Sequence, residues 1–260
     1  MTSRGAPDAA TVGQAEAALY RRLEVACAAA RSAGVAGRFR AFTHRGLHAV
    51  MASDPALGFL CTISGVTGDL TSAAVELLAA WNEPGPTVLA ASDLDPGAEA
   101  QLCAAGMVRA APRLLALRPL DRAAASPAAT DPDLLDAVDA ESFVAVLLAG
   151  YQADGVVAAF IGAEHRDPTV RRCLLVDGAT PVAAGAMTVH GDVAVLGGAS
   201  TLPSHRGQGA QTRLLRHRLR TAADVGCTMA VATARPGSVS AANLERAGFQ
   251  LHLRAAWTPG

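Results

Sequence analysis

The sequence predicts an α/β protein built from two tandem units, each a mixed, mostly antiparallel sheet flanked by helices. Short runs rich in Val, Leu and Thr, typical of strands, alternate with segments of helical periodicity. The stretch DRAAASPAATDPD contains two prolines and no periodicity, as a linker would. The same order of elements then begins again. We therefore expect one unit over residues 1–120, a linker over 121–131 and a second unit over 132–260.

The first half contains the elements of one unit, from an opening helix to a closing strand. Helical spacing indicates helices over 14–31, 71–81 and 96–106, the second with a cap near Asp69. Runs bounded by Gly, Pro or Asp indicate strands over 46–53, 57–66, 86–92 and 111–120.

The second half repeats this order. It predicts helices over 134–150, 155–164, 210–225 and 238–248 and strands over 171–178, 227–234 and 249–257, with a two-strand hairpin over 181–201. The segments EAQLCAAGMVRAAPRLLAL and AANLERAGFQLHLRAAW both place a helix, a Gly and a strand in the same order. A diverged tandem repeat explains the correspondence.

Composition and charge exclude several classes of partner. The chain of 260 residues has a net charge of −1 and is 51% hydrophobic, so it has no general attraction for nucleic acid or an anionic membrane. The five widely spaced cysteines form no C-x-x-C, which argues against a disulfide framework and against a metal site. No apolar run reaches the ~18 residues of a membrane span. We expect a cytoplasmic protein, and a monomer because a tandem repeat can imitate a dimer.

One Gly-rich stretch, TLPSHRGQGAQTRLL, lies where a strand gives way to a helix. The first amides of a helix lack intrahelical partners, and the helix dipole favours an anion there. Gly207 and Gly209 remove the Cβ atoms that would hold a phosphate away, and Arg206 could add a charged fork. The spacing matches neither a dinucleotide-binding motif nor a P-loop. The residues alone leave a phosphate site and an ordinary turn open.

This stretch resembles the acetyl-coenzyme A loop of the GNAT (Gcn5-related) N-acetyltransferase superfamily. Pro203, Arg206, Gly207 and Gly209 stand in register with its pattern, and NLERAGF is similar to its closing helix and Gly-Phe. Residues 131–258 match the family in order of elements. Residues 15–120 resemble a degenerate copy, as in the tandem two-unit bacterial type.

The resemblance implies roles for named residues. Backbone amides of Arg206, Gly207, Gln208, Gly209, Ala210 and Gln211 would bind the pyrophosphate of acetyl-coenzyme A or another acyl-coenzyme A. Ala199, Ser200, Thr201 and Leu202 would pair with its pantetheine arm, and an amide of this strand would polarise the thioester. Gln211 departs from the small residue of the pattern. The first half has GVTGDLTSAAVELL instead, where Asp69 would repel phosphate, so we expect that half to be a scaffold.

The catalytic groups that are frequent in the family are missing. The strand VAVLGGAST has no glutamate, and Leu244 stands where the family places a tyrosine. Ser240 and Asn243 could reach the thiol, although Ser240 is also a candidate helix cap. His190 could act as a base, but a turn residue is its plainer interpretation, and His205 flanks the loop, where a solvated side chain is expected. Glu141 and Tyr151 could line the acceptor pocket, with core or surface positions as the plainer interpretation. Catalysis by proximity and an oxyanion contact is the alternative.

The resemblance predicts an N-acyltransferase that moves an acetyl or other small acyl group from coenzyme A to the primary amine of a small molecule. Two alternatives stay open. The acyl group could come from a carrier-protein phosphopantetheine thioester in natural-product biosynthesis, with Arg213, Arg216 and Arg220 as a docking face; a solvated face is their plainer interpretation. The protein could instead be a catalytically silent module that binds acyl-coenzyme A.

Overall fold

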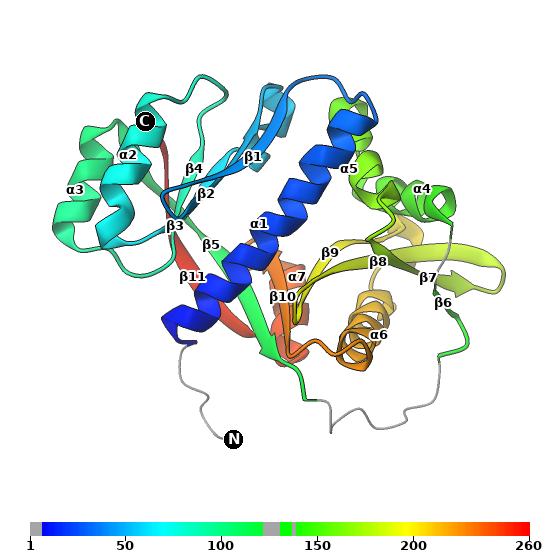
Figure 1. The fold of residues 1–260 in the computed structure, drawn as a ribbon. Coiled ribbons are helices and arrows are strands. Elements are labelled where there is room, and N and C mark those ends of the chain that lie inside the picture. Colours follow the sequence, from blue (N-terminus) through cyan, green and yellow to red (C-terminus); the bar gives the residue numbers. More distant parts are fainter. Residues whose placement is uncertain (1–6, 122–130, 137–138) are drawn as a thin grey trace.

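The computed structural model describes residues 7–121, 131–136 and 139–260, which form one mixed sheet of eleven strands with helices on both faces (Figure 1). The predicted α/β class is confirmed. The strands are β1 (Phe39–His44), β2 (Leu47–Ala52), β3 (Thr62–Val66), β4 (Thr87–Ala90), β5 (Met107–Pro119), β6 (Leu134–Asp136), β7 (Arg171–Asp177), β8 (Thr180–His190), β9 (Val193–Thr201), β10 (Met229–Ala234) and β11 (Gln250–Pro259).

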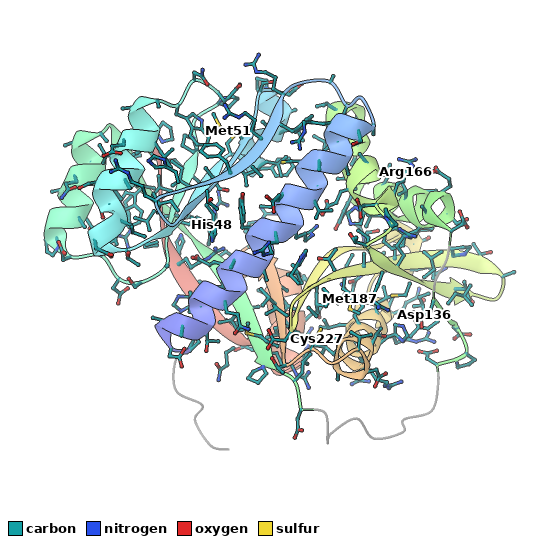
Figure 2. All side chains as sticks on the ribbon, in the orientation of Figure 1. His48, Met51, Asp136, Arg166, Met187 and Cys227 are labelled. Atoms are coloured by element: carbon teal, nitrogen blue, oxygen red, sulfur yellow. The ribbon has the colours of Figure 1, made fainter. Side chains whose placement is uncertain are left out.

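The helices divide between the two faces of the sheet. They are α1 (Ala9–Ser32), α2 (Thr71–Ala79), α3 (Pro96–Ala104), α4 (Ala140–Tyr151), α5 (Gly155–Arg166), α6 (Ala210–Asp224) and α7 (Val239–Arg246). Buried clusters join α1, α4 and α5 to one face and α2, α3, α6 and α7 to the other. Met187 and Cys227, labelled in Figure 2, belong to the cluster under α6 and α7.

The predicted repeat is confirmed by the order of elements. Each half has an antiparallel pair, a third strand, a helix, and then a strand parallel to the third: β3 pairs with β4, and β9 with β10. In each half a further helix and a long strand follow, namely α3 and β5, and α7 and β11.

Four local predictions were wrong or incomplete. Residues 134–136 form the edge strand β6 because they pair with β7, and the helix α4 begins only after its cap, Asp139. Residues 55–60 form a 3₁₀ helix whose cap is Asp54. Asp69 accepts a hydrogen bond from Thr67 and does not cap α2. Strand β1 was not predicted, since the run FRAFTH has mixed polarity.

The two halves exchange their last strands. The sheet order is β1-β2-β3-β4-β11-β5-β10-β9-β8-β7-β6, so β11 pairs with β4 of the first half and β5 pairs with β10 of the second. The two exchanged strands also pair with each other from Gln250–Leu117 to Pro259–Met107. Most of the expected linker, residues 122–130, lies outside the described residues. The unit boundaries 1–120 and 132–260 stay a proposal, and the strand order shows that these segments interlock.

Helix α1 crosses the face of the sheet where the halves meet (Figure 1). Its residues Val12, Ala15 and Ala18 pack on β5, β9 and β10. On the same helix, Glu16 is buried and forms an ion pair of 3.2 Å with Arg254 of β11. Burial raises the pKa of Glu16, and Arg254 opposes this shift. This pair joins the first helix to the last strand.

None of the helices in the described parts of the chain is long and apolar enough to cross a membrane.

The buried pair yields a first prediction. Glu16→Leu should destabilise the fold by about 3–5 kcal/mol, because it leaves the Arg254 cation buried without its partner. The double variant Glu16→Leu/Arg254→Met should recover most of that loss, since it replaces both charges by apolar groups. Urea unfolding of the three proteins measures both quantities. A single variant as stable as the parent would contradict this account.

Candidate functional site

The central feature of the second half is the early separation of two parallel strands. Strands β9 and β10 pair only from Val193–Met229 to Val195–Val231. Beyond this point β9 continues along β8, and β10 continues along β5. On β9 a bulge follows: Ala184 and Ala186 of β8 face Ser200 and Gly197, so β9 holds one extra residue between them. The edges of β9 and β10 therefore diverge.

A cavity of about 800 Å³ opens where the strands diverge. Its walls come from β9, β10, the loop before α6, α6 itself, α7 and the end of α4. The apolar wall includes Leu196, Leu215, Ala232 and Leu244. An edge of β9 thus faces a cavity, and an extended chain with amide groups could pair with it as an added strand.

The loop predicted to bind phosphate lies at one end of this cavity. Helix α6 begins after Gly209, which has φ +81° and provides no side-chain cap. Within the described residues, the amides of Gly207, Gln208, Gly209, Ala210 and Gln211 have no hydrogen-bond partner. A Cβ atom at Gly207 or Gly209 would meet nothing within 4 Å. The loop therefore presents unpaired N–H groups and open space at a helix N-terminus, which suits a phosphate.

The guanidinium of Arg206 binds backbone at this end of the cavity. It donates to the carbonyl oxygens of Gly150 (Nη2, 2.8 Å) and Thr201 (Nε, 3.3 Å). These bonds hold the loop against the end of α4 and the end of β9. Arg206 is exposed, lines the cavity and forms no ion pair within the described residues, so its charge adds to that of the helix N-terminus.

Most of the residues predicted to bind coenzyme A line the cavity, and two do not. Cavity walls include Ala199, Ser200, Thr201, Arg206, Gly207, Gly209, Ala210 and Gln211. Leu202 packs instead against the cluster under α4, and Gln208 donates to Ser204 O at 3.4 Å. Gln211, the departure from the family pattern, donates from its side chain to Thr201 Oγ1 at 2.9 Å and so ties the first turn of α6 to β9.

The two predicted catalytic residues line the cavity from α7. Ser240 is exposed in the first turn of this helix, and Asn243 accepts a hydrogen bond from Arg246. The predicted cap role of Ser240 was wrong, because Ser238 is the N-cap and accepts from the amide of Ala241 at 3.1 Å. Leu244 lies buried in the cavity wall, and its apolar side chain can neither donate nor accept a proton.

Tyr151, the last residue of α4, brings a hydroxyl to the bulge. The amide of Ala199 donates to its Oη at 3.0 Å, so the hydroxyl proton remains free to be donated. Burial raises the pKa of Tyr151, and the phenol stays protonated at neutral pH. The structure thus places the hydroxyl of Tyr151 in the cavity wall, where sequence alone left pocket, core and surface positions open.

Two adjacent glycines on β9 make room for two polar side chains, Arg22 and His165. A Cβ at Gly197 would lie 2.5 Å from the Arg22 guanidinium, and one at Gly198 would lie 2.0 Å from His165 Nε2. Arg22 comes from α1 of the first half and pairs with Glu164 at 2.6 Å. His165 Nδ1 lies 2.8 Å from the carbonyl of Ile161. Because Gly197 and Gly198 have no side chains, Arg22 and His165 can pack directly against the backbone of β9.

The remaining candidates have other partners. His190 ends β8 and pairs with Val193 beside the hairpin turn, as its plainer interpretation predicted. His205 borders the cavity, and its Nε2 lies 3.5 Å from Asp177 Oδ2. Glu141 pairs with Arg166 at 2.6 Å on the surface.

The arginines of α6 divide into three environments. Arg213 binds Asp133 at 2.7 Å and also Asp131, and so fastens α6 to the segment before β6. Arg216 is exposed and Arg220 is half-buried. Arg218 is buried, 5% exposed, and lines the cavity. Sequence analysis missed Arg218, although it continues the spacing of Ala210, Leu214 and Ala222 along the apolar side of the helix.

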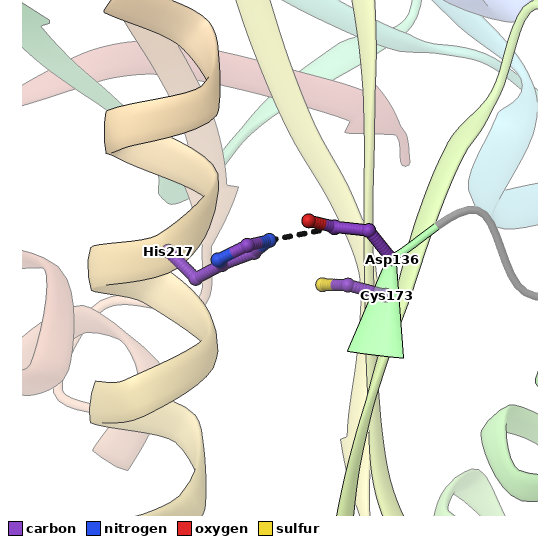
Figure 3. A group of neighbouring side chains, drawn as sticks. All are labelled: Asp136, Cys173 and His217. Carbon is purple, nitrogen blue, oxygen red and sulfur yellow. Dashed lines mark hydrogen bonds and ion pairs between the residues drawn. The ribbon is translucent and has the colours of Figure 1, made fainter. Parts of the chain in front are cut away.

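One group of metal-ligand side chains lies between α6 and the strands β6 and β7 (Figure 3). Ligand atoms of Asp136, Cys173 and His217 lie within 4.8 Å of one another and could hold a metal ion. His217 Nε2 lies 2.7 Å from Asp136 Oδ1, and Cys173 donates to Gly185 O at 3.2 Å. Burial raises the pKa of the Cys173 thiol to about 11. The three side chains therefore have partners of their own and connect α6 with β6 and β7.

Comparison with known proteins defines the class. The model of the acetyltransferase (GNAT) family matches residues 114–249, more than half of the chain and the whole of the site described above. The chain therefore belongs to the GNAT family of acetyltransferases. A search of curated protein sequences finds no significant match.

Solved structures extend the likeness of the fold to both halves. A GCN5-related N-acetyltransferase from Kribbella flavida is 19% identical, covers 89% of this chain and 96% of its own, and has a TM-score of 0.58. An acetyltransferase of the GNAT family from Colwellia psychrerythraea is 15% identical, covers 98% of each chain and has a TM-score of 0.55. At these identities the likeness concerns the fold, and it extends over both halves of this chain.

The contact at Gly198 yields a second prediction. Gly198→Ala should lower the free energy of unfolding by about 2–4 kcal/mol, because φ is +59° and the new Cβ would collide with His165. Gly191→Ala is the matched control: φ is +63° but nothing lies within 4 Å, so strain alone should cost about 1 kcal/mol. Urea unfolding distinguishes them. Equal losses would contradict the close packing of His165.

The buried histidine yields a third prediction. Burial lowers the pKa of His165 below its ordinary value of 6.5, while Glu164 opposes the shift. Below pH 6.5 the unfolded chain therefore binds a proton that the native state does not, and stability should fall as the pH drops from 7 towards 5. Burial shifts His48, His190 and His252 in the same direction.

His165→Asn should reduce this slope. Thermal unfolding from pH 5 to 8 is the measurement. A slope identical to the parent in His165→Asn would show that His165 does not contribute.

Proposed function

We propose that the protein is an N-acyltransferase that moves an acetyl or other small acyl group from acyl-coenzyme A to the primary amine of a small molecule. The observation that carries the proposal is the set of five unpaired amides at the uncapped start of α6, beside the cavity between β9 and β10. The pyrophosphate would bind these amides, and the pantetheine arm would lie along the free edge of β9. Membership of an acetyltransferase family supports this reading.

The position of the Tyr151 hydroxyl favours an active transferase over a module that binds acyl-coenzyme A without catalysis. In the transfer the C–N bond forms as the C–S bond breaks, so the amine gives up a proton and the leaving thiolate takes one. We infer that the Tyr151 hydroxyl protonates the departing sulfur. Ser240 and Asn243 remain our proposed contacts to the sulfur from the α7 side. The tyrosine that is absent at Leu244 would be replaced from another helix.

The position of Arg213 favours coenzyme A over a carrier protein as donor. A docking face of Arg213, Arg216 and Arg220 would need three free cations, and Arg213 is already paired with Asp131 and Asp133. The five cysteines are all free, which supports a reducing compartment such as the cytoplasm. We keep the monomer and the scaffold role of the first half as parts of the proposal.

Gly209→Glu tests the phosphate position and is the fourth prediction. The carboxylate would stand among the unpaired amides, so acetyl-coenzyme A binding should weaken about 100-fold or more in calorimetric titration. The positive φ of Gly209 should cost about 1 kcal/mol of unfolding free energy, which leaves the protein folded. Gly191→Glu is the matched control, since it adds the same charge at another glycine of positive φ with open space around it. Binding by Gly209→Glu that equals the control would overturn the proposed site. Thiol release with a panel of amines then tests transfer.

A further inference from the structure

Arg218 occupies a position in α6 where an apolar side chain would be expected. The residues four positions before and after it, Leu214 and Ala222, are both buried, with exposures of 0%. A guanidinium at such a position must be compensated, because burying an uncompensated charge is costly. Its partners therefore indicate why it is there.

The protein compensates this cation only in part. Arg218 donates from Nε to Leu214 O at 3.2 Å and from Nη1 to Ala186 O at 3.1 Å, both neutral carbonyls. Within the described residues it forms no ion pair with a carboxylate, whereas the other buried arginine, Arg254, pairs with Glu16. Burial lowers the pKa of Arg218, although an arginine remains charged.

The cation lines the cavity proposed to hold the acyl donor. It lies eight residues beyond the start of α6, about 12 Å along the helix axis from the unpaired amides. Its donation to Ala186 O places the guanidinium beside the bulge of β9, where the Tyr151 hydroxyl meets Ala199. Arg218 is thus at the end of the cavity that would receive the acyl group, away from the phosphates.

We propose that Arg218 selects an acyl group with a terminal carboxylate, such as a short dicarboxylic acyl thioester of coenzyme A. This inference rests on the proposed function and names its donor. A carboxylate would supply the anion that the protein does not, among apolar walls that strengthen the pair. An uncharged acyl group would close the cavity over an unpaired cation and would be disfavoured for that reason.

The carboxylate takes no part in the bond changes. The thioester carbon forms its bond to the amine nitrogen and loses its bond to sulfur. The amine gives up one proton, the thiolate receives one, and the product amide keeps the free carboxylate. Arg218 binds the acyl group and is here a specificity-determining residue.

Calorimetric binding of succinyl-, butyryl- and acetyl-coenzyme A, without amine, tests the proposal. Butyryl matches the length of succinyl without its charge. The parent protein should bind succinyl-coenzyme A roughly 10- to 100-fold more tightly than either neutral donor. Arg218→Met should lose this preference. Arg216→Met, an exposed arginine on the same helix, should keep it.

Different failures have different meanings. A parent without the preference, or an Arg218→Met protein that retains it, overturns the inference. Equal weakening of all three donors by Arg218→Met would also overturn it, because Arg218 would then contact a part common to every donor. Those results leave the proposed function standing. If the parent binds none of the donors and no free coenzyme A, the proposed function itself fails. The parent's own preference needs no variant, so misfolding of Arg218→Met cannot hide the answer.

Discussion

The early end of pairing between β9 and β10 is the constraint on which the site depends. The parallel strands β9 and β10 stop pairing after Val195 and Val231, because β9 carries one extra residue and bends away from β10. That single insertion produces the free strand edge and the cavity, and it leads the chain into the loop before α6. The glycines at the bulge are part of the same constraint, since side chains there would collide with Arg22 and His165.

Two ion pairs connect the first half of the chain to the second. Arg22 of α1 pairs with Glu164 of α5 beside the bulge. Glu16 of the same helix pairs with Arg254 on the last strand. These contacts give the first half a physical connection to the site even though its own loop carries Asp69. Through these ion pairs the first half fixes the positions of charged groups in the second, in addition to covering an apolar surface.

Local pattern was enough to predict much of this architecture. The α/β class, the repeat and the loop before α6 follow from periodicity and from glycine spacing, because short-range backbone chemistry determines them. The exchange of β5 and β11 does not follow, since strand order depends on pairing between distant segments. Arg206 illustrates the same limit at the site: its position is visible in the sequence, but its bonds to Gly150 and Thr201 require the tertiary structure. Arg218 was a visible signal that went unused: it is a single charge in a row of apolar residues spaced four apart, Ala210, Leu214 and Ala222.

The exchange of the last strands also bears on how the chain is made. During synthesis on a ribosome, β4 emerges long before its neighbour β11, and some 160 residues separate the end of one from the start of the other. Until then the sheet of the first half has an open edge at β4, and β5 lacks its neighbour β11, while its other neighbour, β10, emerges only shortly before β11. The two halves cannot mature one after the other as independent bodies. The centre of the sheet is completed only when β11 is inserted between β4 and β5, so the complete sheet forms late and requires the whole chain.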